Sequence, residues 1–309
     1  MSKALKLRNQ YWSDNPAIPI WVDISKVGLD QFFTKSRIAA NCQTSLIDFM
    51  RRDGAFPDDY FFVEPSAGTG SFFQYLPRNR RAGIDLAPLC EGLQTYDFLS
   101  WQPPPKQKRI AVIGNPPFGY RGWLALAFLN HAARWADYVG MILPMAFQSE
   151  GKGSPRLRVD GLRLVHSEVL PSGSFVDIAG TDVNINALWQ IWQRGVNNPP
   201  IRRNCGQFVD LFTVDKRKER LCGMKRIHEA DFFIQRTFFG DPPDLVQDFD
   251  LVKYVCGYGI VIKRSKERVL EAFRRVNWLE YSNLAAHNCH HISMYHIHNA
   301  LYDNGLCDG

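Results

Sequence analysis

The chain has 309 residues, a net charge of +6, 45% hydrophobic residues and 22% charged residues. This composition is that of a globular protein and excludes a wholly disordered chain and a fibrous repeat. No run of about 18 apolar residues occurs, and the first residues lack the apolar core of a signal peptide. We therefore expect a cytoplasmic or nucleoid-associated protein that is neither secreted nor bound to a membrane. The positive charge is compatible with a polyanionic partner without requiring one.

Short apolar runs alternate with helical stretches after a basic lead-in over residues 1–30. The first predicted element is a helix over 31–52, which Thr34 can cap. Strands at 59–65 and 81–86 follow, with a helix between them, and a third strand ends within 96–101. The later elements are a strand at 109–117, a helix at 123–135, a strand at 136–144 and a late strand or hairpin arm at 183–192. This alternation predicts an α/β fold, a Rossmann-like doubly wound sheet, mainly parallel, over 31–194.

The composition changes from residue 195, where a proline- and asparagine-containing linker precedes short strand-like runs and two basic stretches. We expect 195–309 to form a small α+β module that recognises a nucleic-acid target. Basic side chains here and in the loop after residue 144 are candidate phosphate contacts, and the alternative is a plain solvated face. These candidates are Lys152, Arg156, Lys216, Arg217, Lys218, Lys263 and Arg264.

A glycine-containing turn, E-P-S-A-G-T-G over 64–70, directly follows a predicted strand. Gly68 and Gly70 allow a tight turn and a close backbone approach to a ligand, in the crevice where doubly wound sheets bind cofactors. The third glycine of the dinucleotide pattern is absent, because Phe73 stands in its place. Glu64 would also repel a pyrophosphate. Both observations disfavour a nicotinamide dinucleotide and favour a cationic cofactor without phosphate.

Two acidic residues follow the next strands. Asp85 ends the second predicted strand and is placed to accept hydrogen bonds from two ribose hydroxyls. Asp97 precedes Phe98, so that a carboxylate could accept from an adenine amine while an aromatic ring covers the base. Either aspartate alone is more typical of a helix cap or a turn, and the cofactor interpretation depends on their series with the glycine turn.

The run Asn115-Pro116-Pro117-Phe118 closes the strand at 109–117. Consecutive prolines fix the backbone and leave their carbonyl groups without strand partners. An amide oxygen, a fixed carbonyl and an aromatic plane then lie within one turn. This set fits a planar base that carries an amino group, with two acceptors for its hydrogens and a ring to stack on.

Together, E-P-S-A-G-T-G and N-P-P-F resemble the motifs of the S-adenosylmethionine-dependent methyltransferases that act on adenine N6. The segment 32–39 resembles the motif that these enzymes place upstream of the glycine turn, and the motif order resembles the gamma type of DNA adenine methyltransferase. The resemblance covers about residues 28–195 and implies a class I methyltransferase fold, S-adenosylmethionine as the cofactor and double-stranded DNA as the partner.

The resemblance also implies a role for each matching residue. The methionine end of the cofactor would be held by Phe33 and Thr34, its methionine and ribose portion by Glu64, Ser66, Gly68 and Gly70, its ribose hydroxyls by Asp85, and its adenine by Asp97 and Phe98. The target amine would be held by Asn115 and Pro116, with Pro117 fixing the turn. The flipped base would stack on Phe118 and on a second aromatic, for which Phe175 is the first candidate and Phe147 the alternative.

Other activities remain open at this point. An RNA adenine-N6 methyltransferase shares N-P-P-F, and a catalytically silent nucleic-acid-binding partner could keep the fold. N4-cytosine methylation is disfavoured because a serine would be more usual than Asn115. Zinc is a further possibility, since five histidines crowd 287–298 beside Cys289, but their spacing fits no usual ligand pattern, and we expect no metal. These histidines are His287, His290, His291, His296 and His298.

Overall fold

The computed structural model describes residues 32–149, 153–177, 179–217, 223–253, 256–285 and 288–307. The chain divides between Pro199 and Pro200 into two compact units, a few residues beyond the boundary that the sequence suggested at 194/195. The predicted lead-in over 1–30, and the candidate phosphate contacts Lys152 and Lys218, lie outside the described residues.

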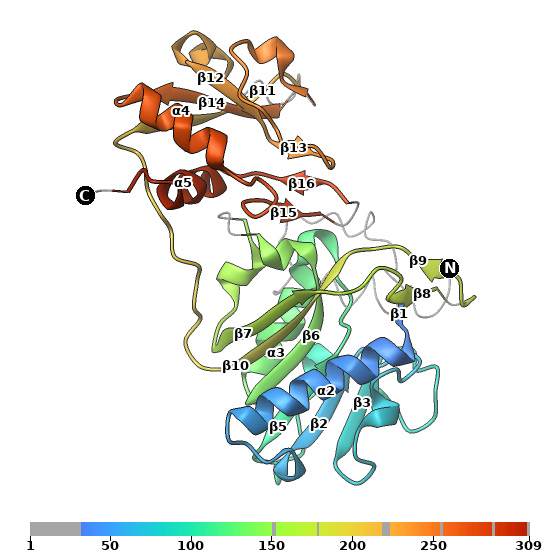
Figure 1. The fold of residues 1–309 in the computed structure, drawn as a ribbon. Helices are drawn as coiled ribbons and strands as arrows, with labels where there is room; N and C mark the ends of the chain where they lie inside the picture. Colours follow the sequence, from blue (N-terminus) through green and yellow to red (C-terminus); the bar gives the residue numbers. More distant parts are fainter. Residues whose placement is uncertain are drawn as a thin grey trace. The chain divides into compact units, whose positions relative to one another are not determined.

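A seven-stranded sheet forms the centre of the first unit (Figure 1). Its order is β4-β3-β2-β5-β6-β10-β7. Its strands are β2 (Phe61–Pro65), β3 (Arg81–Asp85), β4 (Gln94–Thr95), β5 (Ile110–Gly114), β6 (Tyr138–Pro144), β7 (Leu162–Val169) and β10 (Ala187–Arg194).

The first five strands of this sheet are parallel, and β10 runs antiparallel to both of its neighbours, β6 and β7. The sheet therefore grows outward in both directions from β2 and β5, as a doubly wound fold does. The predicted Rossmann-like, mainly parallel α/β fold is confirmed. The chain order reverses between β2 and β5, and ligands bind at such a switch point in open α/β sheets.

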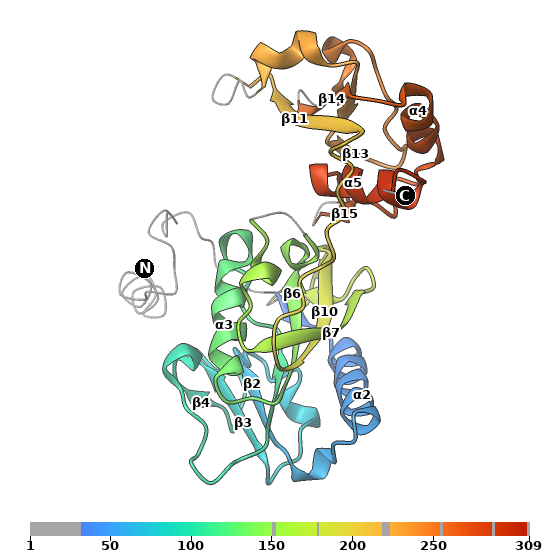
Figure 2. The ribbon, with the colours of Figure 1, turned by 90° about the vertical axis from the view of Figure 1, so that its left-hand side faces the viewer.

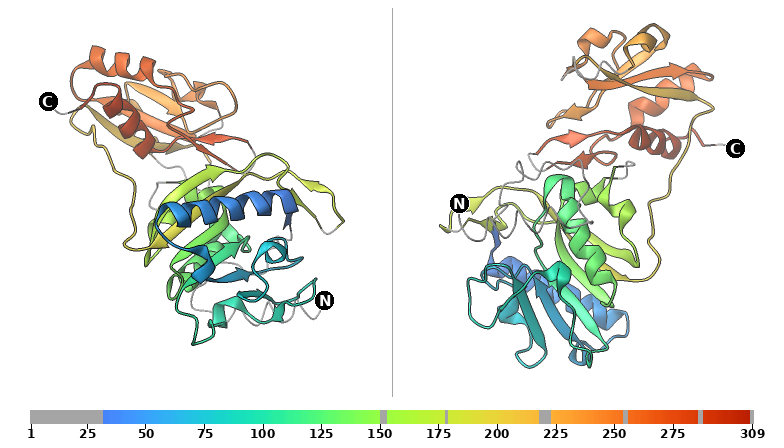
Figure 3. Two further views of the ribbon diagram at one scale, coloured as in Figure 1. Left: turned by 60° about the horizontal axis from the view of Figure 1, so that its bottom comes forward. Right: turned by 180° about the vertical axis from the view of Figure 1, so that it is seen from behind.

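One long helix covers each face of the sheet, α2 (Ser36–Arg52) on one and α3 (Trp123–Ala133) on the other (Figures 2 and 3). The apolar residues of α2 recur every three or four positions, which places them on one stripe. That stripe packs on the sheet residues Phe62, Ile113 and Trp189. Nearly every residue of α3 is buried, so this helix carries no comparable polar face.

The helix predicted over 31–52 begins later than expected because Phe33–Thr34 form a strand, β1. Strand β1 pairs with β8 (Phe175–Val176), and β8 pairs with β9 (Asp182–Val183). Lys35 occupies the N-cap position of α2, with no side-chain cap bond. The prediction that Thr34 caps this helix was therefore wrong, because strand pairing already fixes its backbone.

Two further local predictions were wrong. The helix expected after the glycine turn is a single 3-10 turn at Phe73–Tyr75, because Leu76 precedes Pro77 and adopts the extended backbone that such a position favours. The strand expected to end within 96–101 is only the two residues of β4. Phe98–Ser100 form another 3-10 turn, which the side chain of Asp97 caps.

The second unit is an α+β fold, as predicted for the C-terminal module. One antiparallel sheet has the order β11-β14-β12, and a small sheet has the order β13-β16-β15. Helices α4 and α5 pack against each other, and their apolar faces join the core beside the first sheet. The elements are β11 (Val209–Asp215), β12 (Phe232–Gln235), β13 (Thr237–Phe238), β14 (Cys256–Ile262), α4 (Lys266–Arg275), β15 (Asn283–Leu284), β16 (His290–His291) and α5 (Met294–Asp303).

Candidate active site

The two loops with the motifs begin side by side at the switch point. Strands β2 and β5 are parallel neighbours, with Phe61 opposite Ile110. A Cβ atom placed on Gly114 would lie 3.2 Å from the carbonyl oxygen of Pro65. The turn that follows β2 and the N-P-P-F run that follows β5 therefore leave the sheet from adjacent positions.

The glycine turn adopts a backbone that side chains would obstruct. Gly68 and Gly70 have φ of +49° and +76°, and Ser66 has +53°. A Cβ on Gly70 would lie 2.7 Å from Sγ of Cys90, and one on Gly68 would lie 3.1 Å from the ring of Phe33. Phe33 belongs to the upstream motif, so its ring lies directly over the glycine turn, and the two sequence segments form one structure.

Two carboxylates hold this turn through backbone N–H groups. Asp85 accepts from Gly68 through Oδ2 and from Ala87 through Oδ1, both at 2.7 Å. Glu64 accepts from Phe72 at 3.3 Å and from Phe73 at 2.5 Å. Glu64 is 2% exposed, and this burial raises the pKa of its carboxyl to about 8, although both N–H groups act in the opposite direction. The turn is therefore a compact, acidic structure.

Asp97 and Phe98, the two residues predicted to contact the cofactor adenine, have different surroundings. Oδ1 of Asp97 accepts from Leu99 N–H at 3.0 Å, which makes this aspartate a turn cap. The ring of Phe98 is 2% exposed and stacks on Phe128 with a centroid distance of 5.1 Å. The prediction that this ring covers the cofactor adenine was wrong, because the ring belongs to the core under α3. A contact through the backbone of Phe98 stays a prediction.

Asn115 follows β5 directly and carries an unpaired polar atom. Its Oδ1 is buried and has no hydrogen-bond partner among the described residues. The next residues, Pro116 and Pro117, are buried and half-buried, and neither can donate a backbone N–H. A buried acceptor without a donor is costly to a fold, so this atom is a candidate acceptor for an incoming N–H.

Thr34 presents a second unpaired polar atom of the same kind. Its residue is 5% exposed, and Oγ1 is buried without a partner among the described residues. Strand pairing with Phe175 fixes its backbone. Because the neighbouring Phe33 covers the glycine turn, the two orphan atoms, Oγ1 of Thr34 and Oδ1 of Asn115, belong to segments that converge on one end of the sheet.

The predicted stacking residues lie close together but are covered by protein. Phe118 is 6% exposed and Phe175 is fully buried. Phe32 makes an edge contact with each, at centroid distances of 5.6 and 5.7 Å. Sequence reasoning missed this role of Phe32, although the residue stands in the quoted upstream motif. The alternative candidate Phe147 is also fully buried, and its ring faces Gly122.

The loop after Phe118 holds an exposed aromatic that sequence reasoning also missed. Tyr120 is 50% exposed, and the guanidinium of Arg121 lies 5.0 Å from its ring centroid. Gly119, Arg121 and Gly122 all have positive φ, and for Arg121 this conformation is strained. Gly119 and Gly122, which flank Tyr120 and Arg121, are the sequence signal for this turn.

The basic candidates of the second unit separate into two groups. Lys216 forms an ion pair with Asp250, and Arg217 pairs with Asp215 at 2.5 Å. Lys263 and Arg264 make no ion pair with a described carboxylate; Lys263 donates to the carbonyl of Gly206. Lys216 and Arg217 thus already have acidic partners, and their contact with phosphates stays a prediction.

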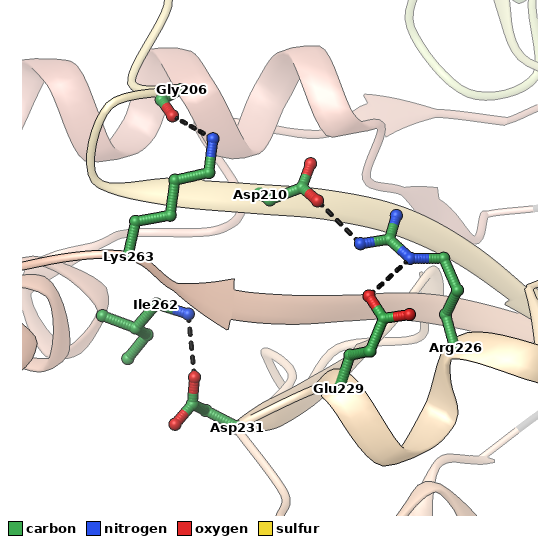
Figure 4. A network of polar contacts seen from close by, with 7 residues as sticks. All are labelled: Gly206, Asp210, Arg226, Glu229, Asp231, Ile262 and Lys263. Carbon is green, nitrogen blue, oxygen red and sulfur yellow. Dashed lines mark hydrogen bonds and ion pairs between the residues drawn. The ribbon is translucent and has the colours of Figure 1, made fainter.

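Figure 4 shows the same contrast for two residues of this unit. Arg226 reaches both Asp210, at 2.7 Å, and Glu229, at 2.8 Å, whereas the side-chain amine of Lys263 donates to the backbone carbonyl of Gly206. In the first unit, Arg156 is half-buried, and its guanidinium donates to the carbonyl of Asn198 at 3.4 Å. Arg156 is therefore part of the packing between a loop and the chain after β10.

The histidine-rich segment uses its rings in hydrogen bonds within the second unit. His290 contacts Ser282, His291 contacts Thr237, and His298 accepts from the N–H of Cys205. His296 closes the capping box at the start of α5. Over the described ranges, no group of three His, Cys, Asp or Glu side chains could hold a metal ion. His287 lies outside those ranges.

The described part of the chain contains no helix that is long and apolar enough to cross a membrane.

Comparisons with known proteins return distant structural matches. No family model matches the sequence, and no curated protein matches it. Among solved structures, the 23S rRNA methyltransferase ErmE is 16% identical, with a TM-score of 0.36 over 56% of this chain and 72% of its own. A magnesium protoporphyrin IX methyltransferase from Synechocystis with bound S-adenosylmethionine is 15% identical, with a TM-score of 0.36 over 63% and 98%.

The modification subunit of a type I restriction enzyme from Vibrio vulnificus is 12% identical, with a TM-score of 0.37 over 84% of this chain and 62% of its own. The three proteins are thus described with different substrates or systems, and similarities this low do not identify a substrate for this chain.

Proposed function

We propose that this protein transfers a methyl group from S-adenosylmethionine to the N6 amine of an adenine extruded from DNA. One observation carries the proposal. Asn115, whose buried Oδ1 has no partner among the described residues, directly follows β5. At this point β5 lies beside the end of β2, where the glycine turn begins. A target amine held there and a cofactor held by the turn would therefore be neighbours at the switch point.

The residues around the turn fit this cofactor. Asp85 supplies a carboxylate to the turn, and a bound cation would favour the charged form of Glu64, so that both suit a ligand with a sulfonium cation and no phosphate. Oγ1 of Thr34 has hydrogen-bonding capacity that the described fold leaves unused, and it would face the methionine end. When bound, the cofactor supplies an activated methyl group.

Asn115 and Pro116 would prepare the target amine. Adenine N6 is a poor nucleophile because its lone pair is delocalised into the ring. The amide oxygen of Asn115 and the carbonyl of Pro116 would each accept one N–H, which favours a pyramidal nitrogen and frees the lone pair. The same two dipoles would offset the positive charge that grows on nitrogen during attack, and the methylated nitrogen would then release one of its two protons to water. Fixed prolines maintain this arrangement without reorganisation.

The phenylalanines would hold the extruded base. Unstacking a base from a duplex costs a few kcal/mol, and stacking on an aromatic ring recovers part of that cost. The rings of Phe118 and Phe175 are buried, and the ring of Phe32 makes an edge contact with each of them. We therefore expect Phe32 to shift when a base enters, so that its place between the two rings becomes free.

A transfer assay with a labelled methyl donor tests the proposal. The full-length protein is incubated with duplex DNA, with ribosomal RNA and with transfer RNA, and the products are digested to nucleosides. We expect label in N6-methyladenine from DNA. Label in RNA alone would show that the substrate is RNA and not DNA. Label in N4-methylcytosine would show that the target base is cytosine and not adenine. Nucleic-acid binding without any transfer would favour a silent partner of the same fold and would overturn the proposal.

A further inference from the structure

Unpaired arginines gather on one surface of the second unit, which we name the arginine face. It consists of Arg202, Arg203, Lys263, Arg264 and Arg268, all of which are exposed. No carboxylate of the described residues lies within ion-pair distance of any of them. By contrast, Lys216, Arg217 and Arg226 form ion pairs, and their acidic partners are Asp210, Asp215, Glu229 and Asp250. The arginine face and the paired cations Lys216, Arg217 and Arg226 therefore differ in available charge.

Contacts within the second unit bring the members of the arginine face together. The guanidinium groups of Arg264 and Arg268 both lie over the ring of Phe208, at 4.5 and 5.4 Å from its centroid. Arg268 also donates to the carbonyl of Gly305, just after α5. Arg203 connects to the same helix, because its N–H donates to Asn299. The face thus extends from the start of α4 across the segment 202–208 to α5.

Aromatic rings orient these guanidinium groups. Besides the pair over Phe208, Arg202 lies over Tyr295 at 5.8 Å, and Arg203 lies over Tyr302 at 4.7 Å. A guanidinium stacked on a ring loses less side-chain freedom when it binds, and its N–H edge still points outward for a bidentate contact. Such an arrangement suits the oxygens of a phosphate.

The charge balance of the face is strongly positive. The segments 202–208 and 263–268 contain six basic residues and one acid, Glu267. Of these six, only Lys266, which is not part of the arginine face, forms an ion pair with a described carboxylate, that of Asp231 at 3.3 Å. Asp210 is within electrostatic reach of Lys263, but its carboxylate is already hydrogen-bonded to Arg226 (Figure 4). Several uncompensated cations along one surface match a repeating anion.

We infer that the arginine face binds the phosphodiester backbone of a nucleic acid, and that the paired cations Lys216, Arg217 and Arg226 do not. The inference rests on the proposed function, because it names the surface that would hold the substrate of that activity. Stacked arginines that contact phosphates contribute affinity and position without reading bases. The binding should therefore depend strongly on salt and weakly on sequence.

The test compares full-length double variants in a salt series. Arg264→Gln/Arg268→Gln and Arg202→Gln/Arg203→Gln each remove two charges from the arginine face. Arg274→Gln/Arg275→Gln is the matched control, because it removes two exposed charges from the last turn of the same helix, α4. Affinity is measured by fluorescence anisotropy with a labelled duplex DNA and with a labelled single-stranded RNA.

We expect each face variant to bind at least tenfold more weakly at low salt. The slope of log affinity against log salt should fall by about 1.8 on duplex DNA and about 1.4 on a single strand, which is the loss of two phosphate contacts. The control should keep the slope of the unmodified protein. A preference for one of the two nucleic acids would identify which backbone the face holds.

Three results would overturn the inference: an unmodified protein that binds neither nucleic acid, face variants with an unchanged slope, or a control that loses as much as they do. Thermal unfolding checks that each variant folds, and the two face variants lie on different segments. Calorimetry with S-adenosylmethionine separates this inference from the proposed function. If the face variants lose nucleic-acid binding while the unmodified protein neither takes up the donor nor transfers methyl groups, the inference stands and the proposed function fails.

Discussion

The loops after β2 and β5 begin side by side and yet differ in how their polar groups are satisfied. Around the loop after β2, Glu64 of β2 and Asp85 at the end of β3 accept backbone N–H groups with both of their oxygens. In the loop after β5, Oδ1 of Asn115 is buried without a partner among the described residues. One loop is held together by its own hydrogen bonds, whereas the other contains an acceptor that folding leaves unused.

This difference separates residues that build the site from residues that would act in it. A substitution in the loop after β2 should disturb both stability and cofactor binding, because the carboxylates hold the turn. A substitution of an unpaired atom should leave stability intact and change only what that atom binds. The predictions below test this distinction from the largest expected effect to the smallest.

Asn115→Ala should give the largest loss of activity. Removing one fixed dipole that opposes the charge of a transition state typically lowers the rate by about 10²–10³-fold. Affinity for S-adenosylmethionine should stay unchanged, because Asn115 faces the target and not the cofactor in our proposal. Methyl transfer to DNA and calorimetric titration of the donor measure the two quantities. Near-normal turnover in this variant would exclude the proposed mechanism.

Asp85→Ala should weaken cofactor binding and also destabilise the protein. The substitution removes a charged acceptor from the N–H groups of Gly68 and Ala87. A hydrogen bond to a charged group contributes about 1.5–3 kcal/mol, so affinity should fall roughly tenfold to 100-fold, and the free energy of unfolding should fall by a similar amount. Asp85→Asn is the companion variant, since it retains one acceptor oxygen and should lose less of both.

An Asp85→Ala protein with unchanged donor affinity would contradict the assignment of the glycine turn as the cofactor site. A loss of stability without a loss of affinity would leave Asp85 a purely structural residue.

The fold class was predictable because the apolar runs of β2, β3, β5 and β6 have the length and continuity of strands buried on both faces. The two motif loops were predictable for a related reason, since chain segments at the carboxyl ends of parallel strands meet at one edge. Boundaries that depend on tertiary pairing were not predictable. Thr34 resembles a helix cap, but its backbone pairs with Phe175, which is 141 positions later in the chain.

Side-chain exposure was the other property that the sequence could not supply. Phe98 and Phe118 both follow strands and both were predicted to face a ligand, but the ring of Phe98 packs on Phe128, and Phe118 is 6% exposed and belongs to the core on the other side. The basic residues at 216–226 were visible in the sequence, whereas the ion pairs of Lys216, Arg217 and Arg226 were not. The acids that pair with Lys216 and Arg226 include Asp250 and Asp210, which lie elsewhere in the chain.

Glu64 should make stability and cofactor binding depend on pH. Burial raises the pKa of its carboxyl to about 8 from an ordinary 4.5. Between these values the folded protein binds more protons at this group than the unfolded chain does, so the free energy of unfolding should fall as pH rises from 4.5 to 8. Glu64→Gln should remove this contribution. Thermal unfolding across that range measures it.

Binding of a sulfonium should favour the charged carboxylate of Glu64 and lower its pKa. Affinity for S-adenosylmethionine should therefore rise with pH below 8, by less than tenfold per pH unit, and then level off. S-adenosylhomocysteine, which lacks the sulfonium charge, is the matched control and should show a weaker dependence. Equal dependence for both ligands would mean that Glu64 senses no charge on the cofactor.

Thr34→Val should give the smallest effect and the clearest test of the orphan atoms. Valine has nearly the same shape, so the variant removes a buried hydroxyl that has no partner among the described residues. Without a ligand, the variant should be as stable as the unmodified protein or more stable by about 1 kcal/mol, because no unsatisfied polar atom remains. Affinity for S-adenosylmethionine should fall about three- to tenfold, because one hydrogen bond is lost. Thr34→Ser, which keeps the hydroxyl, should retain the affinity. If the hydroxyl binds the ligand, Thr34→Val should lose affinity for S-adenosylmethionine without losing stability. A loss of stability with unchanged affinity would instead make the hydroxyl part of the fold.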